Sequence, residues 1–165
     1  MHAIVKVITK HPERIGQVMD LYTWDEDEGN VDAWFDYWTV GGRYDGLLLV
    51  TPQTKPLIGA SCFECAGRRL YYTAPDGRTY RRTNGARIRN IKMGVLLQAT
   101  ELAGELVERP YIYVLDLGDE PEDAVLETCE NLFERNEINE QIAWMREQIE
   151  HPKPEWSVII VDVHM

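Results

Sequence analysis

The chain has 165 residues, of which 44% are hydrophobic and 27% charged, and its formal net charge is −11. These values are ordinary for one globular domain with a full hydrophobic core, so we expect a single domain over residues 1–165. The longest apolar runs are strand-sized, which excludes a membrane-spanning helix, and the first residues lack a signal-peptide pattern, so we expect a cytoplasmic protein.

The first third of the chain predicts a strand, a short helix and a loop. Residues 2–9 alternate and are rich in β-branched side chains, which is typical of a strand. Pro12 then stands where a helix would begin, and apolar residues follow it at helical spacing. The acidic run at 25–30 interrupts this pattern and indicates a solvated loop.

Residues 34–46, WFDYWTVGGRYDG, combine five aromatic residues with a Gly-Gly pair and one arginine. Gly41 and Gly42 permit a sharp turn, because they adopt backbone angles that other residues avoid. Arg43 follows the turn with a fork of donors that suits a carboxylate or a phosphate. The stretch therefore predicts a binding site that includes Arg43, with side chains that could wall it: Trp34, Trp38 and Tyr44.

The middle of the chain predicts a buried strand at 47–50 and then a β-hairpin. Arginine- and tyrosine-rich segments at 69–73 and 78–82 flank Pro75-Asp76-Gly77, a common turn combination. Apolar spacing next predicts a helix over 91–107, ending before a proline.

The last third predicts strand, helix, strand. A strand is expected at 111–117, and Asp119 is a good N-cap for an acidic helix that runs from Glu120 to Glu150. The last strand is expected at 156–163. The whole order favours an α+β fold of ferredoxin-like type: a mixed or antiparallel sheet, helices on one face, and an inserted basic β-hairpin at about 67–85. The first and last strands would lie in one sheet.

Charge is unevenly distributed along the chain. Residues 67–92 carry eight Arg and Lys residues against one acid, whereas residues 116–150 carry twelve acids against two arginines. An acidic protein with one basic patch suits charge-complementary docking with a protein partner better than general nucleic-acid binding.

Two short motifs resemble those of a group of small phage- and prophage-associated bacterial proteins. WTVGGRYDG at residues 38–46 resembles their W-Y-x-x-G-G-R-W-x-G motif, with Tyr44 in place of the usual tryptophan. VDVHM at residues 161–165 resembles their V-D-x-H-I ending. The group has no established activity, so the resemblance implies a mobile-element context and a domain of unknown function.

The closing motif also carries candidate chemistry. Asp162 and His164 are two apart on a predicted strand and therefore project from one face. A carboxylate beside an imidazole can fix its tautomer, and His2 could complete a two-His-one-carboxylate metal site. Arg43 could hold a substrate in the same pocket, pair with a buried acid such as Asp36 or Asp162, or stack on its aromatic neighbours. The alternative is a polar strand end without chemistry.

The cysteines do not predict a cofactor. Cys62 and Cys65 form one C-x-x-C pair without a second pair or a zinc-finger histidine spacing, so ordinary thiols are expected before zinc or redox chemistry. We therefore expect no cofactor.

These observations favour a non-enzymatic interaction protein that binds a host or phage macromolecule. The binding surface would be the acidic helix face or the basic hairpin, with Arg81 and Arg82 as binding residues together with Trp38, Gly41, Gly42, Arg43 and Tyr44. A protein partner is expected, and nucleic acid could bind the hairpin through its arginines and tyrosines. The alternative is a small enzyme or ligand-binding protein acting on a nucleotide or phosphoester, with Arg43, Asp162 and His164 in one pocket.

Overall fold

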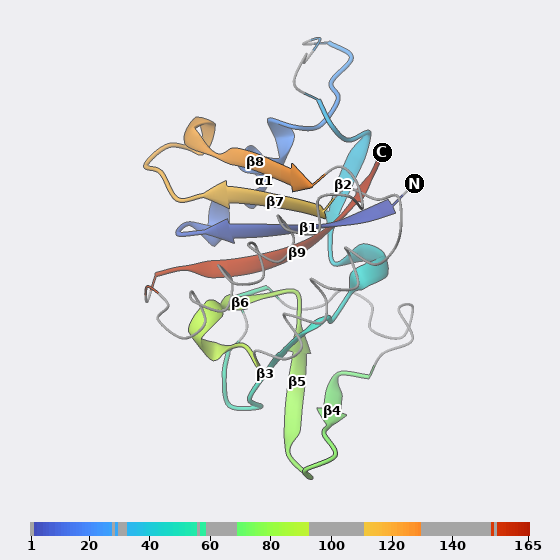
Figure 1. The fold of residues 1–165 in the computed structure, drawn as a ribbon, viewed down its shortest axis with the longest axis vertical. Coiled ribbons are helices and arrows are strands. Elements are labelled where there is room, and N and C mark those ends of the chain that lie inside the picture. Colours follow the sequence, from blue (N-terminus) through green and yellow to red (C-terminus); the bar gives the residue numbers. More distant parts are fainter. Residues whose placement is uncertain are drawn as a thin grey trace.

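The structure is a computed structural model that describes residues 2–27, 29, 33–55, 57–58, 69–92, 111–129, 153 and 155–165. These residues form a mixed α+β fold that is mostly sheet (Figure 1). No helix among them is long and apolar enough to cross a membrane.

A large sheet forms the centre of the molecule. Its strands lie in the order β2-β9-β1-β7-β8, and β6 pairs with β9 beside β2. Among the described strand pairs of this sheet, only β1–β7 is parallel. The strands are β1 (His2–Thr9), β2 (Tyr37–Val40), β6 (Gly85–Arg87), β7 (Tyr111–Asp116), β8 (Val125–Cys129) and β9 (Ser157–His164).

The first and last strands are neighbours, as the sequence predicted. β1 and β9 pair antiparallel over their full length, from His2 opposite His164 to Thr9 opposite Ser157. Seven of the eight residues in each strand are buried, which explains why both strands are almost continuously apolar. The pairing brings the two ends of the described chain together.

A second sheet contains β3 (Leu48–Val50), β5 (Thr79–Thr83) and β4 (Tyr71–Thr73), in that order. β4 and β5 pair antiparallel across a turn in which Ala74 donates to Arg78 O and Gly77 donates to Ala74 O. β3 is fully buried, whereas the turn between β4 and β5 is exposed.

The helical elements that the structure describes are short. Pro12 begins the 3-10 turn η1 (Pro12–Arg14), which leads into α1 (Ile15–Asp20). Three further 3-10 turns are η2 (Gly42–Tyr44), η3 (Ile88–Asn90) and η4 (Pro121–Asp123). α1 contributes Val18 and Met19 to the core.

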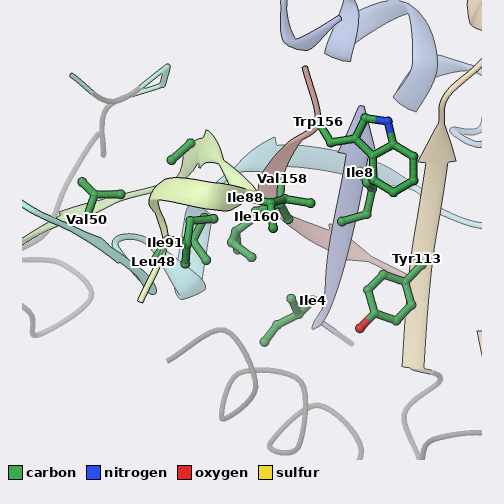
Figure 2. Close-up of a cluster of buried hydrophobic side chains, with 11 residues drawn as sticks. Ile4, Ile8, Leu48, Val50, Ile88, Ile91, Tyr113, Trp156, Val158 and Ile160 are labelled. Carbon is green, nitrogen blue, oxygen red and sulfur yellow. The ribbon is translucent and has the colours of Figure 1, made fainter. Parts of the chain in front are cut away.

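The core has two halves, one on each face of the large sheet. Ile4 and Ile8 of β1 pack with residues of β3, η3 and β9 on one face, as Figure 2 shows. Val5 and Val7 face the other side and pack with α1. Alternation along a strand produces this division, because successive side chains project to opposite faces.

Lys6 lies within the first of these faces. Its side chain is buried, and Nζ is 5.4 Å from the centroid of the Tyr113 ring. Burial lowers the pKa of Lys6 well below its usual value, because a charged amine loses hydration there.

The prediction of a helix from Glu120 onward is wrong for residues 124–129. Pro121–Asp123 form a single 3-10 turn, with Glu120 rather than Asp119 at its N-cap, and Val125–Cys129 then form β8. A spacing of four between apolar residues fits one face of a helix and equally one face of a strand. Pairing with β7, which places Val125 opposite Leu115, selects the strand.

Several other predictions lie outside the described residues. These are most of the helix over 91–107, the acidic helix over 130–150, and Cys62 and Cys65. The described residues do not show the helices on one face that a ferredoxin-like core requires.

Candidate functional site

Three aromatic side chains form a row at one end of the large sheet. His2, His164 and Tyr37 lie opposite one another on the adjacent strands β1, β9 and β2, so they share a face. The His164 ring stacks on Tyr37 with centroids 5.1 Å apart, and the His2 ring meets His164 edge to face at 5.2 Å. This row is the part of the candidate site that the pairing of the termini creates.

Asp162 lies beneath this row and is almost fully buried. Its Oδ1 is 2.8 Å from His2 Nδ1, and its Oδ2 accepts the backbone N–H of Arg43 at 2.9 Å. Each carboxylate oxygen therefore has a partner, as a buried charge requires. The contact joins three distant parts of the chain.

His164 has a different carboxylate partner from the one expected. Its Nδ1 is 2.9 Å from Asp36 Oδ2, on the side of β2, whereas Asp162 turns toward His2. Asp162 and His164 thus belong to two separate histidine–carboxylate pairs. Among the residues that the structure describes, no three His, Cys, Asp or Glu side chains are grouped so that they could hold a metal ion. The predicted two-His-one-carboxylate metal site at His2, Asp162 and His164 is therefore not formed.

The Gly-Gly turn crosses directly over Asp162. Gly41 and Gly42 have φ values of +76° and +53°, in the left-handed region that favours glycine. A Cβ on Gly41 would lie 2.6 Å from Asp45 Oδ1, and one on Gly42 would lie 2.6 Å from Asp162 Cβ. Both glycines are required by conformation and by space.

Asn84 fixes the same turn from the other side. It is fully buried, donates from Nδ2 to Asp45 Oδ1, and accepts the Gly46 N–H at 2.7 Å. Its backbone carbonyl accepts the N–H of Ile160, while Gly41 donates to Ile160 O. These bonds lie where β2 ends and β6 begins along β9. Sequence reasoning missed the link between Asn84 and Asp45, because the two residues are distant in the chain.

Arg43 is attached to the site by its backbone, and its side chain is exposed. The expected aromatic wall is not formed by Trp38 and Tyr44. Trp38 packs on the α1 face of the large sheet and donates from Nε1 to Asp20 Oδ1 at 3.1 Å, whereas Tyr44 packs against the opposite half of the core. Successive side chains of β2 project to opposite faces of the sheet, so Tyr37 lies against His164 whereas Trp38 lies on the α1 face.

The basic hairpin (residues 69–83) forms a separate surface on the small sheet. Tyr72 and Tyr80 lie opposite each other, with the Arg82 guanidinium 5.3 Å from the Tyr72 ring centroid. The Lys92 amine is 4.5 Å from the Tyr80 ring centroid. Each ring therefore carries a cation on its face.

The arginines of this hairpin differ in exposure. Arg81 and Arg82 are half-buried, and Arg82 also donates from Nη1 to Gly46 O at 3.2 Å. Arg69 and Arg78 are exposed, as is Tyr71. Arg69, Arg78 and Tyr71 are thus more accessible than Arg81 and Arg82.

Arg14, Thr9 and Asp116 form a third polar cluster, which links the parallel strands β1 and β7. Arg14 donates from Nε and Nη2 to the two oxygens of Asp116 at 3.0 and 2.6 Å, and Thr9 donates to Asp116 Oδ2 at 2.6 Å. The hydrogen bond to Asp116 is the main reason why the pKa of Arg14 is raised. The Asp116 carboxylate is fully used in these contacts, so we interpret the cluster as structural.

Comparison with known proteins found no matching family model, no matching curated protein and no matching solved structure.

Proposed function

We propose that this chain is a non-enzymatic interaction protein of phage or mobile-element type, which acts in the cytoplasm and binds a host or phage macromolecule through the basic hairpin. The observation that carries the proposal is the array of arginines and tyrosines on the small sheet. Arg69, Arg78 and Tyr71 are exposed, and the Tyr72–Arg82 pair lies on the strand face opposite to Tyr71. Cations beside aromatic rings are suited to an anionic surface.

A protein with an acidic surface is the expected partner. The net charge of −11 repels a long polyanion, whereas a local positive patch can still guide docking of a compact acidic surface. Nucleic acid is the second possible partner, because tyrosines can stack on unpaired bases and arginines can contact phosphates.

The acidic helix face is the other surface that we propose, now restricted to residues 130–150 because β8 occupies 125–129. We also propose that helices within 91–107 and 130–150 cover one face of the large sheet, as in a ferredoxin-like core. Both proposals rest on the apolar spacing in the sequence.

Binding of two labelled probes tests the role of the hairpin. A short fluorescent polyglutamate peptide, chosen to limit repulsion by the net charge, and a single-stranded oligonucleotide of equal length would be titrated at low salt, with fluorescence anisotropy as the readout. We expect the peptide to bind, and Arg69→Glu/Arg78→Glu to weaken it about tenfold or more, since each reversed charge costs on the order of 1 kcal/mol.

The control is Lys10→Glu/Lys55→Glu, which changes the net charge equally at positions outside residues 69–92 and should bind as the wild type does. If the wild type binds neither the peptide nor the oligonucleotide, the proposal is refuted. Equal loss in both double variants would mean that net charge, rather than the hairpin, governs binding.

A second candidate function is a small enzyme or ligand-binding protein that acts on a nucleotide or phosphoester through Arg43, Asp162 and His164. It is supported by the His2–Asp162 contact and by the exposed Arg43 side chain, whose backbone binds the same carboxylate. An orienting carboxylate and an anion-holding arginine are recurrent parts of such sites.

Proton NMR of the histidine rings tests this candidate. Addition of a nucleoside monophosphate that shifts the His2 and His164 signals in the wild type, but not in Arg43→Ala, would support it. Signals that stay unchanged would leave the interaction protein as the proposal.

A further inference from the structure

The segment between α1 and β2 is acidic and presents aromatic side chains to solvent. Residues 20–36 carry seven Asp and Glu residues and no Lys, Arg or His. Within or next to this segment, Trp24, Trp34 and Tyr37 are 53%, 39% and 51% exposed. Trp24 and Trp34 adjoin the bridged residues Thr23 and Phe35, so the two exposed tryptophans lie on neighbouring stretches of backbone, and aromatic side chains are enriched at interfaces. We call the described residues of this stretch, 20–27 and 33–37, the acidic aromatic surface; five of them are Asp or Glu.

The backbone holds this surface in a fixed arrangement. Thr23 and Phe35 form a parallel bridge, Trp24 donates to Phe35 O at 2.8 Å, and Trp34 donates to Tyr22 O at 2.7 Å. The exposed tryptophans are therefore anchored on each side of the buried Phe35. A surface that is already ordered loses less entropy when it binds.

The chemistry of this surface suits arginine and lysine side chains. Carboxylates pair with guanidinium groups, and tryptophan and tyrosine rings attract cations to their faces. Glu26 and Asp27 are exposed and follow Trp24 closely in the chain. The expected occupant is therefore a basic segment that also brings aromatic or apolar contacts.

The same chain contains a segment of that composition. Residues 69–92 carry seven Arg and Lys residues against the single acid Asp76, together with three tyrosines. Figure 1 shows the β4–β5 turn at one end of the long axis and the described part of the α1–β2 segment toward the other end. Opposite charges at opposite ends allow one copy to meet the next.

We infer that the anionic partner of the basic hairpin is a second copy of this chain, and that its acidic aromatic surface receives the hairpin head to tail. Arg69 and Arg78 of one copy pair with carboxylates such as Glu26 and Asp27 of the next, and Tyr71 packs on Trp24. The contact joins two different surfaces, so it is heterologous and can repeat from copy to copy. This inference rests on the proposed function, because it names the partner of the same hairpin.

Sedimentation velocity of the full chain tests the inference. We expect the average mass of the wild type to rise with protein concentration at about 0.1 M salt and to return to the monomer at about 1 M, since the Debye length falls from about 10 to about 3 Å. A wild type that stays monomeric at low salt over the whole concentration range would overturn the inference.

Two variants show whether the contact is the one described. The hairpin variant is Arg69→Glu/Arg78→Glu, and the surface variant is Trp24→Ala/Glu26→Gln/Asp27→Asn. In each variant alone, self-association should be weakened about tenfold or more, so that the monomer predominates. An equimolar mixture should form a 1:1 heterodimer and nothing larger, because only one intact hairpin and one intact acidic aromatic surface can meet.

Matched controls change charge elsewhere on the surface, at the half-buried Lys10 and at the exposed Lys55, Glu122 and Glu155. Lys10→Glu/Lys55→Glu and Glu122→Gln/Glu155→Gln should assemble as the wild type does. Assembly that persists in the hairpin or surface variant would overturn the inference. A monomeric wild type that still binds the polyglutamate peptide through its hairpin would refute self-association and leave the proposed function standing.

Discussion

Replacing Gly42 with alanine should destabilise the protein through Asp162. The new Cβ would lie 2.6 Å from Asp162 Cβ, at a residue whose φ is +53°. The carboxylate would have to move, because the turn is held by backbone hydrogen bonds on both sides. Its hydrogen bond from the Arg43 N–H and its contact with His2 would then be lost.

The expected loss of stability is the sum of two free-energy costs, one from the backbone of residue 42 and one from the displaced Asp162 carboxylate. An alanine in the left-handed region costs about 1–2 kcal/mol. Loss of a hydrogen bond to a buried charged group costs about 1.5–3 kcal/mol more. The free energy of unfolding should therefore fall by about 3–5 kcal/mol, and the melting temperature by roughly 6–20 °C for a domain of this length.

Gly77→Ala is the matched control for Gly42→Ala. Its φ is +84°, and no heavy atom lies within 4 Å of the added Cβ, so only the backbone term of about 1–2 kcal/mol remains. Urea denaturation of both variants, followed by tryptophan fluorescence, measures the difference. If Gly42→Ala loses no more stability than Gly77→Ala, the reasoning about Asp162 is refuted.

Two further substitutions test the core. Trp38→Ala should lower the free energy of unfolding by about 2–3 kcal/mol, somewhat less than for a fully buried tryptophan, and an unchanged melting temperature would show that Trp38 is a binding surface instead. Lys6→Met should raise the free energy of unfolding at neutral pH. Burial lowers the pKa of Lys6 below 10.5 in the folded chain, so the unfolded chain binds more protons at pH values between the folded and unfolded pKa. The free energy of unfolding of the wild type should therefore rise with pH across that window. Urea denaturation at several pH values should show that this rise is absent in Lys6→Met. A rise of equal size in both proteins would contradict the prediction.

The strands at both ends of the chain could be predicted because their pattern is long and local. Eight residues of alternating, β-branched composition at 2–9 allow little besides a strand, and the run at 157–164 is similar. The turn at Pro75-Asp76-Gly77 was also visible, since its residue types set the backbone angles.

The site partners could not be predicted, because they depend on contacts between distant segments. Asp162 and His164 share a strand face as expected, yet each binds a residue from another strand or its flank: His2 in one case and Asp36 in the other. Strand register decides which side chains meet, and no local pattern contains it. β8 was missed for the same reason, since pairing with β7 outweighs a spacing that fits helix and strand alike.

The most direct test of the central claim is a map of the binding surface by ¹H–¹⁵N NMR. The labelled protein would be titrated with the polyglutamate peptide at low salt, at a protein concentration where sedimentation shows monomer. The account predicts that backbone amide signals change within residues 69–92, and that the amides of His2, Arg43 and His164 stay unchanged. Changes at those three residues with an unaffected hairpin would contradict it and favour a ligand site at the end of the large sheet.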